Sequence, residues 1–441
     1  MMRYAICTLL LVGSVSARPA DLLEIFRAAQ SSDAVYAAAR AVWTAGQEKL
    51  PQGRAGLLPS VTFSASTQYN ERDLRFRDPR IPGSNAPFNS NAITLSLSQP
   101  IFRRQNTLVY EQAKSQVVQS DAVFAQAAQD LILRVAQAYF DVLLAQNTVE
   151  LAAAQLVAIG QQLEQAKRNF EVGTATITDT HDAQARYDLT VAGEIAAKND
   201  LEVKKRALAQ IIGRTAPPLA TVGPKFPLTG PEPDNMEAWV TEAVASNLQV
   251  LVTQAALDFA VQEVGRNRAA HLPTLDVIAS YTEAGTGSGI NGGPGSDTTT
   301  KVIGLQLAVP LYQGGLVNSR VREALANEEK ARQDLDNARR SAELAARQSF
   351  LGVTSGIAQV KALQQALVSS QSSLDSSRLG QEVGVRTQVD VLNAQQLLFQ
   401  TRRDLAQAVY NYLISVLRLK AAVGKLSEDD IARINTWLER P

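Results

Sequence analysis

The stretch from Glu382 to Gln395 reads E-V-G-V-R-T-Q-V-D-V-L-N-A-Q, and the chain contains an earlier version of it. Glu171 to Gln184 reads E-V-G-T-A-T-I-T-D-T-H-D-A-Q, and half of its positions are identical at one constant offset of 211 residues. A repeat of this length indicates two related lobes rather than a solenoid of short units. The sequence therefore predicts a tandem duplication.

Each copy combines the signals for the end of one helix and the start of the next. Gly173 and Gly384 suit the left-handed conformation that ends many helices, and a short polar link follows each glycine. A Thr-x-x-Asp motif, such as Thr387 to Asp390, then opens an apolar-periodic run. Each copy is thus predicted to be the turn of a helical hairpin, and we call these two turns the hairpin tips.

The N-terminus and the overall charge indicate an exported protein without a nucleic-acid partner. Met1 to Ala17 has a basic residue, an apolar run and a small-residue cleavage site, which predicts a secretory signal peptide too short to span a membrane. The single cysteine, Cys7, lies inside that apolar run, so we expect a mature chain that is not lipidated and has no disulfide. The 43 basic and 43 acidic residues balance, which favours no nucleic-acid binding.

The apolar pattern predicts a β-hairpin in each half. After a helical face between Leu22 and Trp43, which should end before Pro51, the period changes to two at Val61 to Asn70 and at Ile93 to Ser98. The polar segment Glu71 to Asn91 is expected to be a long loop between these strands.

The second half repeats this plan with strands at Thr274 to Tyr281 and Ile303 to Val309, joined by a loop from Gly285 to Thr300. Both hairpins finish at a proline, Pro100 or Pro310, which ends strand pairing.

Long helices follow each β-hairpin. Arg103 to Phe170 contains 68 residues without an internal proline, which would extend roughly 100 Å as a helix. Two apolar columns run through it with heptad spacing and fail only at Asp121, which predicts a coiled-coil seam. A return helix should run from about Thr178 to Gly213, and the corresponding pair in the second half from Val317 to about Leu379 and from Val389 to Gly424.

These signals divide the chain into five predicted parts. They are a signal peptide (1–17), a first repeat (18–213, with β-hairpin 61–102 and helical hairpin 103–213), a proline-rich linker (214–235), a second repeat (236–424, with β-hairpin 274–312 and helical hairpin 315–424) and a C-terminal tail (425–441) with one short helix from Glu428 to Leu438.

The four strands constrain the assembly. No later segment approaches 18 uninterrupted apolar residues, so no transmembrane helix is expected. Four amphipathic strands cannot close a membrane barrel, and an open sheet edge is not tolerated in lipid. Several copies must therefore share one barrel. The helices, much longer than a bilayer core of about 30 Å, must project from the membrane.

The second copy resembles the TolC family of outer-membrane efflux and type I secretion channels. The similarity rests on Val383-Gly384-Val385-Arg386-Thr387-x-Val389-Asp390-Val391-Leu392-x-Ala394, on Tyr410-Asn411-Tyr412-Leu413-Ile414, and on the duplicated hairpins with their proline exits. It implies an α+β membrane protein, in which a homotrimer shares a twelve-stranded β-barrel in the outer membrane and a twelve-helix α-barrel in the periplasm. The linker and the tail would form an equatorial region.

The resemblance also implies a function and partners. Such proteins are passive exit ducts in the outer membrane of Gram-negative bacteria, in contact with its lipid. An inner-membrane transporter of the ABC or RND type and a periplasmic adaptor recruit them for protein secretion or drug efflux. The family does not consist of enzymes and requires no cofactor.

Asp390 is a candidate for a ring of acidic residues at the periplasmic end of the pore. Three copies would favour cations and raise one another's pKa by like-charge proximity. The same residue also completes a capping box with Thr387, which stabilises a helix start without any pore. The family's second acidic position is Asn393 here, so the ring would be weaker.

Arg386 matches the residue that, in the family, ties one hairpin tip to its neighbour. The implied partners are Thr178 and Asp179 on the other tip. Gln381 stands where the family often has tyrosine, so this gate lock would have one contact fewer. A solvated loop arginine, worth about 0–1 kcal/mol as a surface pair, is the alternative.

Other functions find less support in the residues. His181 and His271 lack a metal-like cluster, no catalytic triad is evident, and the loop Gly285 to Gly295 lacks the Lys-Ser/Thr of a phosphate-binding loop. A periplasmic coiled-coil adaptor is the main alternative, but it would not need two duplicated amphipathic β-hairpins. A secreted hydrolase would need a convergent polar cluster.

Overall fold

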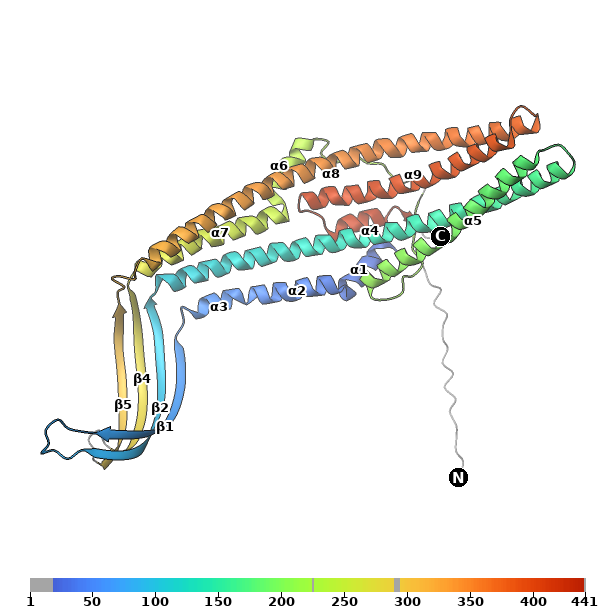
Figure 1. Ribbon diagram of the computed structural model, residues 1–441. Helices are drawn as coiled ribbons and strands as arrows, with labels where there is room; N and C mark the ends of the chain where they lie inside the picture. The colour runs from blue at the N-terminus through green and yellow to red at the C-terminus, as the bar shows by residue number, and fades with distance from the viewer. Residues whose placement is uncertain (1–18, 224–225, 289–293, 440–441) are drawn as a thin grey trace, which may run out of the picture. The chain divides into compact units, whose positions relative to one another are not determined.

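The computed structural model describes residues 19–223, 226–288 and 294–439. The signal peptide expected at Met1 to Ala17 lies outside them. These residues form two compact units, each built from parts of both sequence repeats. Unit 2 comprises Val42–Val123 and Gln249–Ala338, and unit 1 comprises the other described residues. The boundaries fall within continuous helices (Figure 1).

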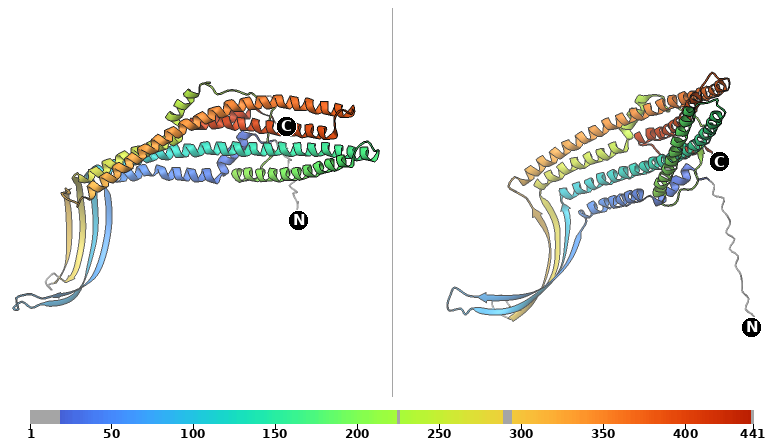
Figure 2. Two further views of the ribbon diagram at one scale, coloured as in Figure 1. Left: turned by 45° about the horizontal axis from the view of Figure 1, so that its top comes forward. Right: turned by 45° about the vertical axis from the view of Figure 1, so that its right-hand side comes forward.

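Unit 2 contains a four-stranded antiparallel sheet with strand order β1-β2-β4-β5. The strands are β1 (Ser60–Leu74), β2 (Ser84–Phe102), β4 (Thr274–Ser288) and β5 (Pro294–Ala308). The central pairing of β2 with β4 joins the two sequence repeats, and the strands remain side by side in both views of Figure 2. The duplication thus produces one sheet rather than two separate hairpins.

The strands are longer than the sequence predicted. The segment Glu71 to Asn91 was expected to be a loop, but the β1–β2 ladder continues to the pair Leu74↔Ser84. Likewise β4 and β5 stay paired through most of the expected loop Gly285 to Thr300, of which residues 289–293 lie outside the described chain. The polar and glycine-rich composition of these two segments therefore did not locate the turns. Two strands can stay paired through backbone hydrogen bonds without an apolar face.

The two outer strands are exposed on both faces and pair with only one neighbour each in the described chain. Every residue of β1 is exposed or half-buried, and so is every residue of β5. Alternating antiparallel pairs make β1 and β5 run in opposite directions. The edge of one sheet can consequently pair with the opposite edge of another copy in the same antiparallel pattern.

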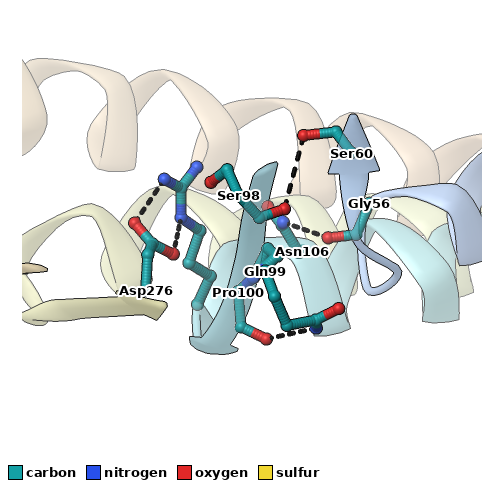
Figure 3. Close-up of polar contacts among 8 residues, drawn as sticks. Gly56, Ser60, Ser98, Gln99, Pro100, Asn106 and Asp276 are labelled. Atoms are coloured by element: carbon teal, nitrogen blue, oxygen red, sulfur yellow. Dashed lines mark hydrogen bonds and ion pairs between the residues drawn. The ribbon is translucent and has the colours of Figure 1, made fainter. Parts of the chain in front are cut away.

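A polar junction holds the sheet where β2 passes into helix α4 (Arg104–Glu171) (Figure 3). The β2–β4 register shifts between Pro100 and Phe102, as at a β-bulge. Directly after it, Arg103 forms two hydrogen bonds of 2.7 and 2.6 Å with the carboxylate of Asp276 on β4. Asp276 is only 5% exposed. This bidentate pair joins the end of the first repeat's β-hairpin to the start of β4, the first strand of the second repeat.

Helical segments complete unit 2. They belong to α2 (Ala34–Gln47), α3 (Lys49–Ala55), α4, α7 (Leu248–Arg268), a 3-10 turn (Ala269–His271) and α8 (Leu316–Glu382). Pro51 does not end the first helical region as expected, because it lies in the first turn of α3, where its missing N–H is not required. Asp121, the one polar exception in the heptad columns, accepts hydrogen bonds from the side chains of Trp43 (2.7 Å) and Gln47 (2.8 Å).

Unit 1 contains the distal parts of α4 and α8 with their return helices, α5 (Ile177–Ile212) and α9 (Gln388–Ala422). The remaining helices are α1 (Leu22–Ser32), α6 (Met236–Ser246) and α10 (Glu428–Asn435). Strand β3 (Thr221–Val222) from the linker pairs with β6 (Leu438–Glu439) from the tail. The tail helix therefore ends earlier than Leu438, which is part of this two-stranded sheet.

Buried tyrosines fix the linker to the long helices in unit 1. Tyr139 of α4 is fully buried and donates to the carbonyl of Ala220 at 2.7 Å. Tyr412 of α9, also buried, donates to the carbonyl of Thr229 at 2.9 Å and accepts from the N–H of that residue at 3.0 Å. Buried hydroxyl groups need such partners, and here the partners lie on the proline-rich segment that follows Arg214.

Two helical stretches in the described chain are long and apolar enough to cross a membrane by length and composition, namely α4 and Met236–His271. No such helix was expected from the sequence, because no segment after the signal peptide has 18 uninterrupted apolar residues. In α4 several apolar residues, among them Leu131, Val135 and Val142 of the heptad columns, are buried against other parts of the chain, although only 22% of the apolar window is buried.

The junction pair predicts a stability effect. Replacing Asp276 by Asn leaves Arg103 without a charged partner, and loss of a charge-assisted contact of this kind costs about 1.5–3 kcal/mol. We expect the thermal midpoint of the folded protein to fall by several degrees. Asp73→Asn is the control, because Asp73 pairs with Arg75 at an exposed position (50% exposed) and should contribute little. Equal midpoints for both variants would contradict a structural role for the junction.

Candidate functional site at the hairpin tips

The two hairpin tips have the same local geometry because their residues repeat. At the start of α5 the hydroxyl of Thr176 accepts from the N–H of Asp179 at 3.2 Å, and the Asp179 carboxylate accepts from the Thr176 N–H at 2.9 Å. Thr387 and Asp390 form the same pair of bonds at 3.2 and 2.9 Å at the start of α9. Both are complete capping boxes.

Glycines make the turns that precede these caps. Gly173 has φ of +76° and Gly384 has φ of +79°, in the left-handed region that residues with a Cβ rarely adopt. The N–H of Gly384 donates to the carbonyl of Gln381 at 3.1 Å, and the N–H of Val385 reaches the carbonyl of Gly380 at 2.8 Å. The turn therefore satisfies the last carbonyls of α8 as it reverses the chain.

Asp390 is part of its helix cap, as the alternative interpretation predicted. Hydrogen bonds from the backbone and then the hydroxyl of Thr387 lower the pKa of Asp390 below its ordinary value of 3.8, and the nearby charge of Arg386 acts in the same direction. In one chain this carboxyl is therefore ionised at neutral pH. Capping does not exclude a role in a pore. Oδ2 of Asp390 accepts the hydrogen bonds from Thr387, and the other carboxylate oxygen, Oδ1, can still face water.

Asn393 lies one turn after Asp390 and accepts a hydrogen bond from Arg186 of α5. The distance from Arg186 Nη2 to Asn393 Oδ1 is 3.0 Å. The sequence analysis did not single out Arg186. No sequence signal marks it, since an arginine at this position of a helix usually faces solvent.

Arg386 is 60% exposed, and its guanidinium is 4.0 Å from the Asp390 carboxylate of the same tip. Within the residues that the structure describes, it makes no hydrogen bond or ion pair with Thr178 or Asp179. Thr178 is exposed, and Asp179 is engaged in its own cap, which lowers its pKa through hydrogen bonds from Thr176. A single chain therefore leaves the proposed gate-lock residues accessible.

Polar contacts join the two hairpins just behind the tips. The side chain of Gln162 on α4 donates to Gln395 Oε1 at 2.8 Å, and Gln388 donates to the backbone carbonyl of Gln162 at 2.9 Å. Gln395 is only 2% exposed. This network was not expected from the sequence, because Gln162 and Gln395 lie outside the apolar columns and a glutamine on a long helix usually faces solvent. Across the described residues, no group of three or more His, Cys, Asp or Glu could hold a metal ion.

The model of the family described as "Outer membrane efflux protein" matches residues 26–214 and again residues 239–425. The chain belongs to this family. The two separate matches coincide with the two halves of the duplication that the hairpin tips revealed.

The relatives span nearly the whole chain. The outer membrane protein TolC of Escherichia coli is 36% identical over 430 residues, which is 96% of this chain and 85% of that protein. The proteases secretion protein PrtF of Dickeya chrysanthemi is 31% identical over 430 residues, covering 96% of this chain and 92% of that protein. These are outer-membrane and secretion proteins by name, which is consistent with a chain that is not an enzyme.

A solved structure shows the same fold. The CmeC outer membrane channel of Campylobacter jejuni superimposes with a TM-score of 0.80 at 17% identity, covering 100% of this chain and 97% of that chain. Strands of a sheet joined to long helical hairpins are thus an arrangement already known from outer-membrane channels.

The caps predict how the tips respond to acid. Because Asp179 and Asp390 have lowered pKa values in the folded chain, their stabilisation is present above pH 3.8 and is lost as the pH falls below that value through the lowered pKa. A spin label at Val385 should therefore become more mobile on acidification in this range. Thr387→Ala, which removes the cap at a cost of about 1 kcal/mol, should be mobile already at neutral pH and respond less. A pH-independent spectrum in the unsubstituted tip would contradict this account.

Proposed function

We propose that this protein is an outer-membrane exit duct of a tripartite export system, for type I secretion and efflux, with a passive pore gated at its periplasmic hairpin tips. The observation that carries the proposal is a sheet with two unsatisfied edges, continuous with helices of 68 and 67 residues, in a chain that matches an outer membrane efflux family twice. The strands cross the outer membrane, and the helices extend into the periplasm.

A homotrimer satisfies the edges of the sheet. The free edges of β1 and β5 run in opposite directions, so copies joined edge to edge make a continuous antiparallel barrel. Three copies give twelve strands, which lies among the even numbers found in outer-membrane barrels. The four long helices of each copy likewise give a twelve-helix barrel, and residues 214–235 and 425–441 form its equatorial region.

The hairpin tips form the gate in this proposal. Asp390 and Asn393 of the three copies surround the periplasmic end of the pore, where the carboxylates favour cations. Arg386 locks its tip to Thr178 and Asp179 of a neighbouring tip, with Gln381 nearby. Its exposure in the single chain is what such a contact between copies requires. A partner opens the gate by binding the open state more tightly than the closed state.

The partners follow from the family. A periplasmic adaptor and an inner-membrane transporter of the ABC or RND type recruit the duct. PrtF, named for protease secretion, supports the secretion role. BepC of Brucella suis, an outer membrane efflux protein 26% identical over 303 residues, supports the efflux role. A periplasmic coiled-coil adaptor is the alternative function, and the long unsatisfied sheet edges argue against it.

Fractionation of cells that produce the protein tests the location and assembly. We expect it in the outer membrane as an oligomer that resists detergent until it is heated, because the closed barrel has no free edge. An adaptor would instead be found with the inner membrane, and a secreted enzyme in a soluble fraction. Either of those results would contradict the proposal.

Single-channel recording of the purified protein in a planar bilayer tests the gate. We expect a small conductance in the unsubstituted protein and a clearly larger one in Arg386→Ser, because the substitution removes the contact that holds the tips together. Arg378→Ser, which changes another arginine near the end of α8, is the matched control and should leave the conductance nearly unchanged. Equal conductance in all three would keep the duct but remove Arg386 from the gate.

A further inference from the structure

Arg186 occupies an unusual position, because a charged side chain near the tip of one hairpin is bound by neutral groups of the other. Its guanidinium donates to Asn393 Oδ1 at 3.0 Å and to Gln396 Oε1 at 3.4 Å. Both acceptors are amides on α9, one turn apart. In the described part of the chain Arg186 forms no ion pair, so its positive charge is not cancelled by a direct partner.

The contact is not imposed by close packing. Arg186 is half-buried and lines a groove of about 480 Å³ between α4, α5 and α9. The groove leaves room for other rotamers, so the observed arrangement reflects the planar fork of the guanidinium binding two amide oxygens. It links α5 of the first helical hairpin to α9 of the second.

The charge of Arg186 lies beside that of Asp390. Residues three apart on a helix share a face, with Cβ atoms about 5–6 Å apart, so Asp390 and Asn393 project from the same side of α9. A guanidinium held on Asn393 is consequently within about one Debye length of the Asp390 carboxylate at physiological salt. Arg386 also lies 4.0 Å from this carboxylate in the single chain, but the proposed gate lock pairs Arg386 with Asp179 of a neighbouring tip. Asp390 and Arg186 are then the two opposite charges that each chain presents at this level.

We propose that Arg186 sets the ion selectivity of the periplasmic entrance. Bound to Asn393, it offsets the charge of Asp390, so that the entrance of the assembled duct is close to neutral instead of strongly acidic. The same bond holds α5 against α9 and favours the closed arrangement. This inference rests on the proposed duct function and assigns a residue that determines the selectivity of that duct.

Measurement of the cation-to-anion permeability ratio in planar bilayers tests the charge. Arg186→Gln should raise the ratio by about two- to fivefold, because three uncompensated carboxylates then surround the pore, and the effect should grow at low salt. Arg403→Gln is the matched control. Arg403 lines the same groove but contacts its neighbour Asp404 at 3.3 Å, so its loss should not change the ratio.

Two further variants separate the charge from the hydrogen bonds. Arg186→Lys keeps the charge and loses the planar fork, so it should keep the ratio of the unsubstituted protein while opening more easily. Asn393→Asp adds one negative charge per chain while Arg186 stays, so by the same charge count it should raise the ratio about as much as Arg186→Gln. Combining Asn393→Asp with Arg186→Gln should give the highest cation preference of all the variants.

The outcomes are distinct. An unchanged ratio in Arg186→Gln, or an equal shift in Arg186→Lys, would overturn the inference while leaving the duct intact. If Arg186→Gln does not assemble, Asn393→Asp still decides, because an unchanged ratio in that variant would show that charge at this position does not set the selectivity. Absence of channels in correctly assembled unsubstituted protein would overturn the duct and this inference together.

Discussion

The unsatisfied backbone groups along β1 and β5 are the constraint on which the rest of the structure depends. Each edge strand has 15 residues, about 50 Å at 3.3 Å per residue, and neither has a second neighbour in the described chain. In lipid each unpaired N–H or C=O costs several kcal/mol. No substitution within one chain can remove this cost. In the proposed barrel, other copies of the sheet supply the missing hydrogen-bond partners, and the opposed directions of the two edges allow them to pair.

This constraint also explains the construction of the helices. In the proposed shared barrel, a helix that leaves a strand meets helices of neighbouring copies, so part of its apolar surface packs against other copies. Val157, Leu189 and Leu351 remain more than half exposed on the long helices, whereas column residues of α4 such as Leu131, Val135 and Val142 are buried. Small residues in those columns permit close approach. The ion pair between Arg103 and Asp276 fixes the start of α4 to strand β4 of the sheet.

Much of this organisation could be predicted because the sequence states it twice. The repeated tips located Gly173 and Gly384, and the change of period located the strands. The ends of the strands were wrong because pairing between Leu74 and Ser84 depends on the neighbouring backbone, which leaves no mark in the composition. Arg186 was missed for a related reason. Its hydrogen-bond acceptors are two side-chain amides more than 200 residues away in the sequence. No local pattern indicates which helix faces Arg186.

Disulfide cross-linking between the edges of neighbouring copies tests the central claim most directly. In a Cys7→Ser background, one cysteine at Ser66 of β1 would be combined in turn with a cysteine at each position of β5 from Asp297 to Ile303. The account predicts that oxidation of outer-membrane preparations gives a covalent trimer at positions set by one register, and no cross-link within a single chain. Cross-linked monomers, or no cross-link at any register in correctly assembled protein, would contradict it.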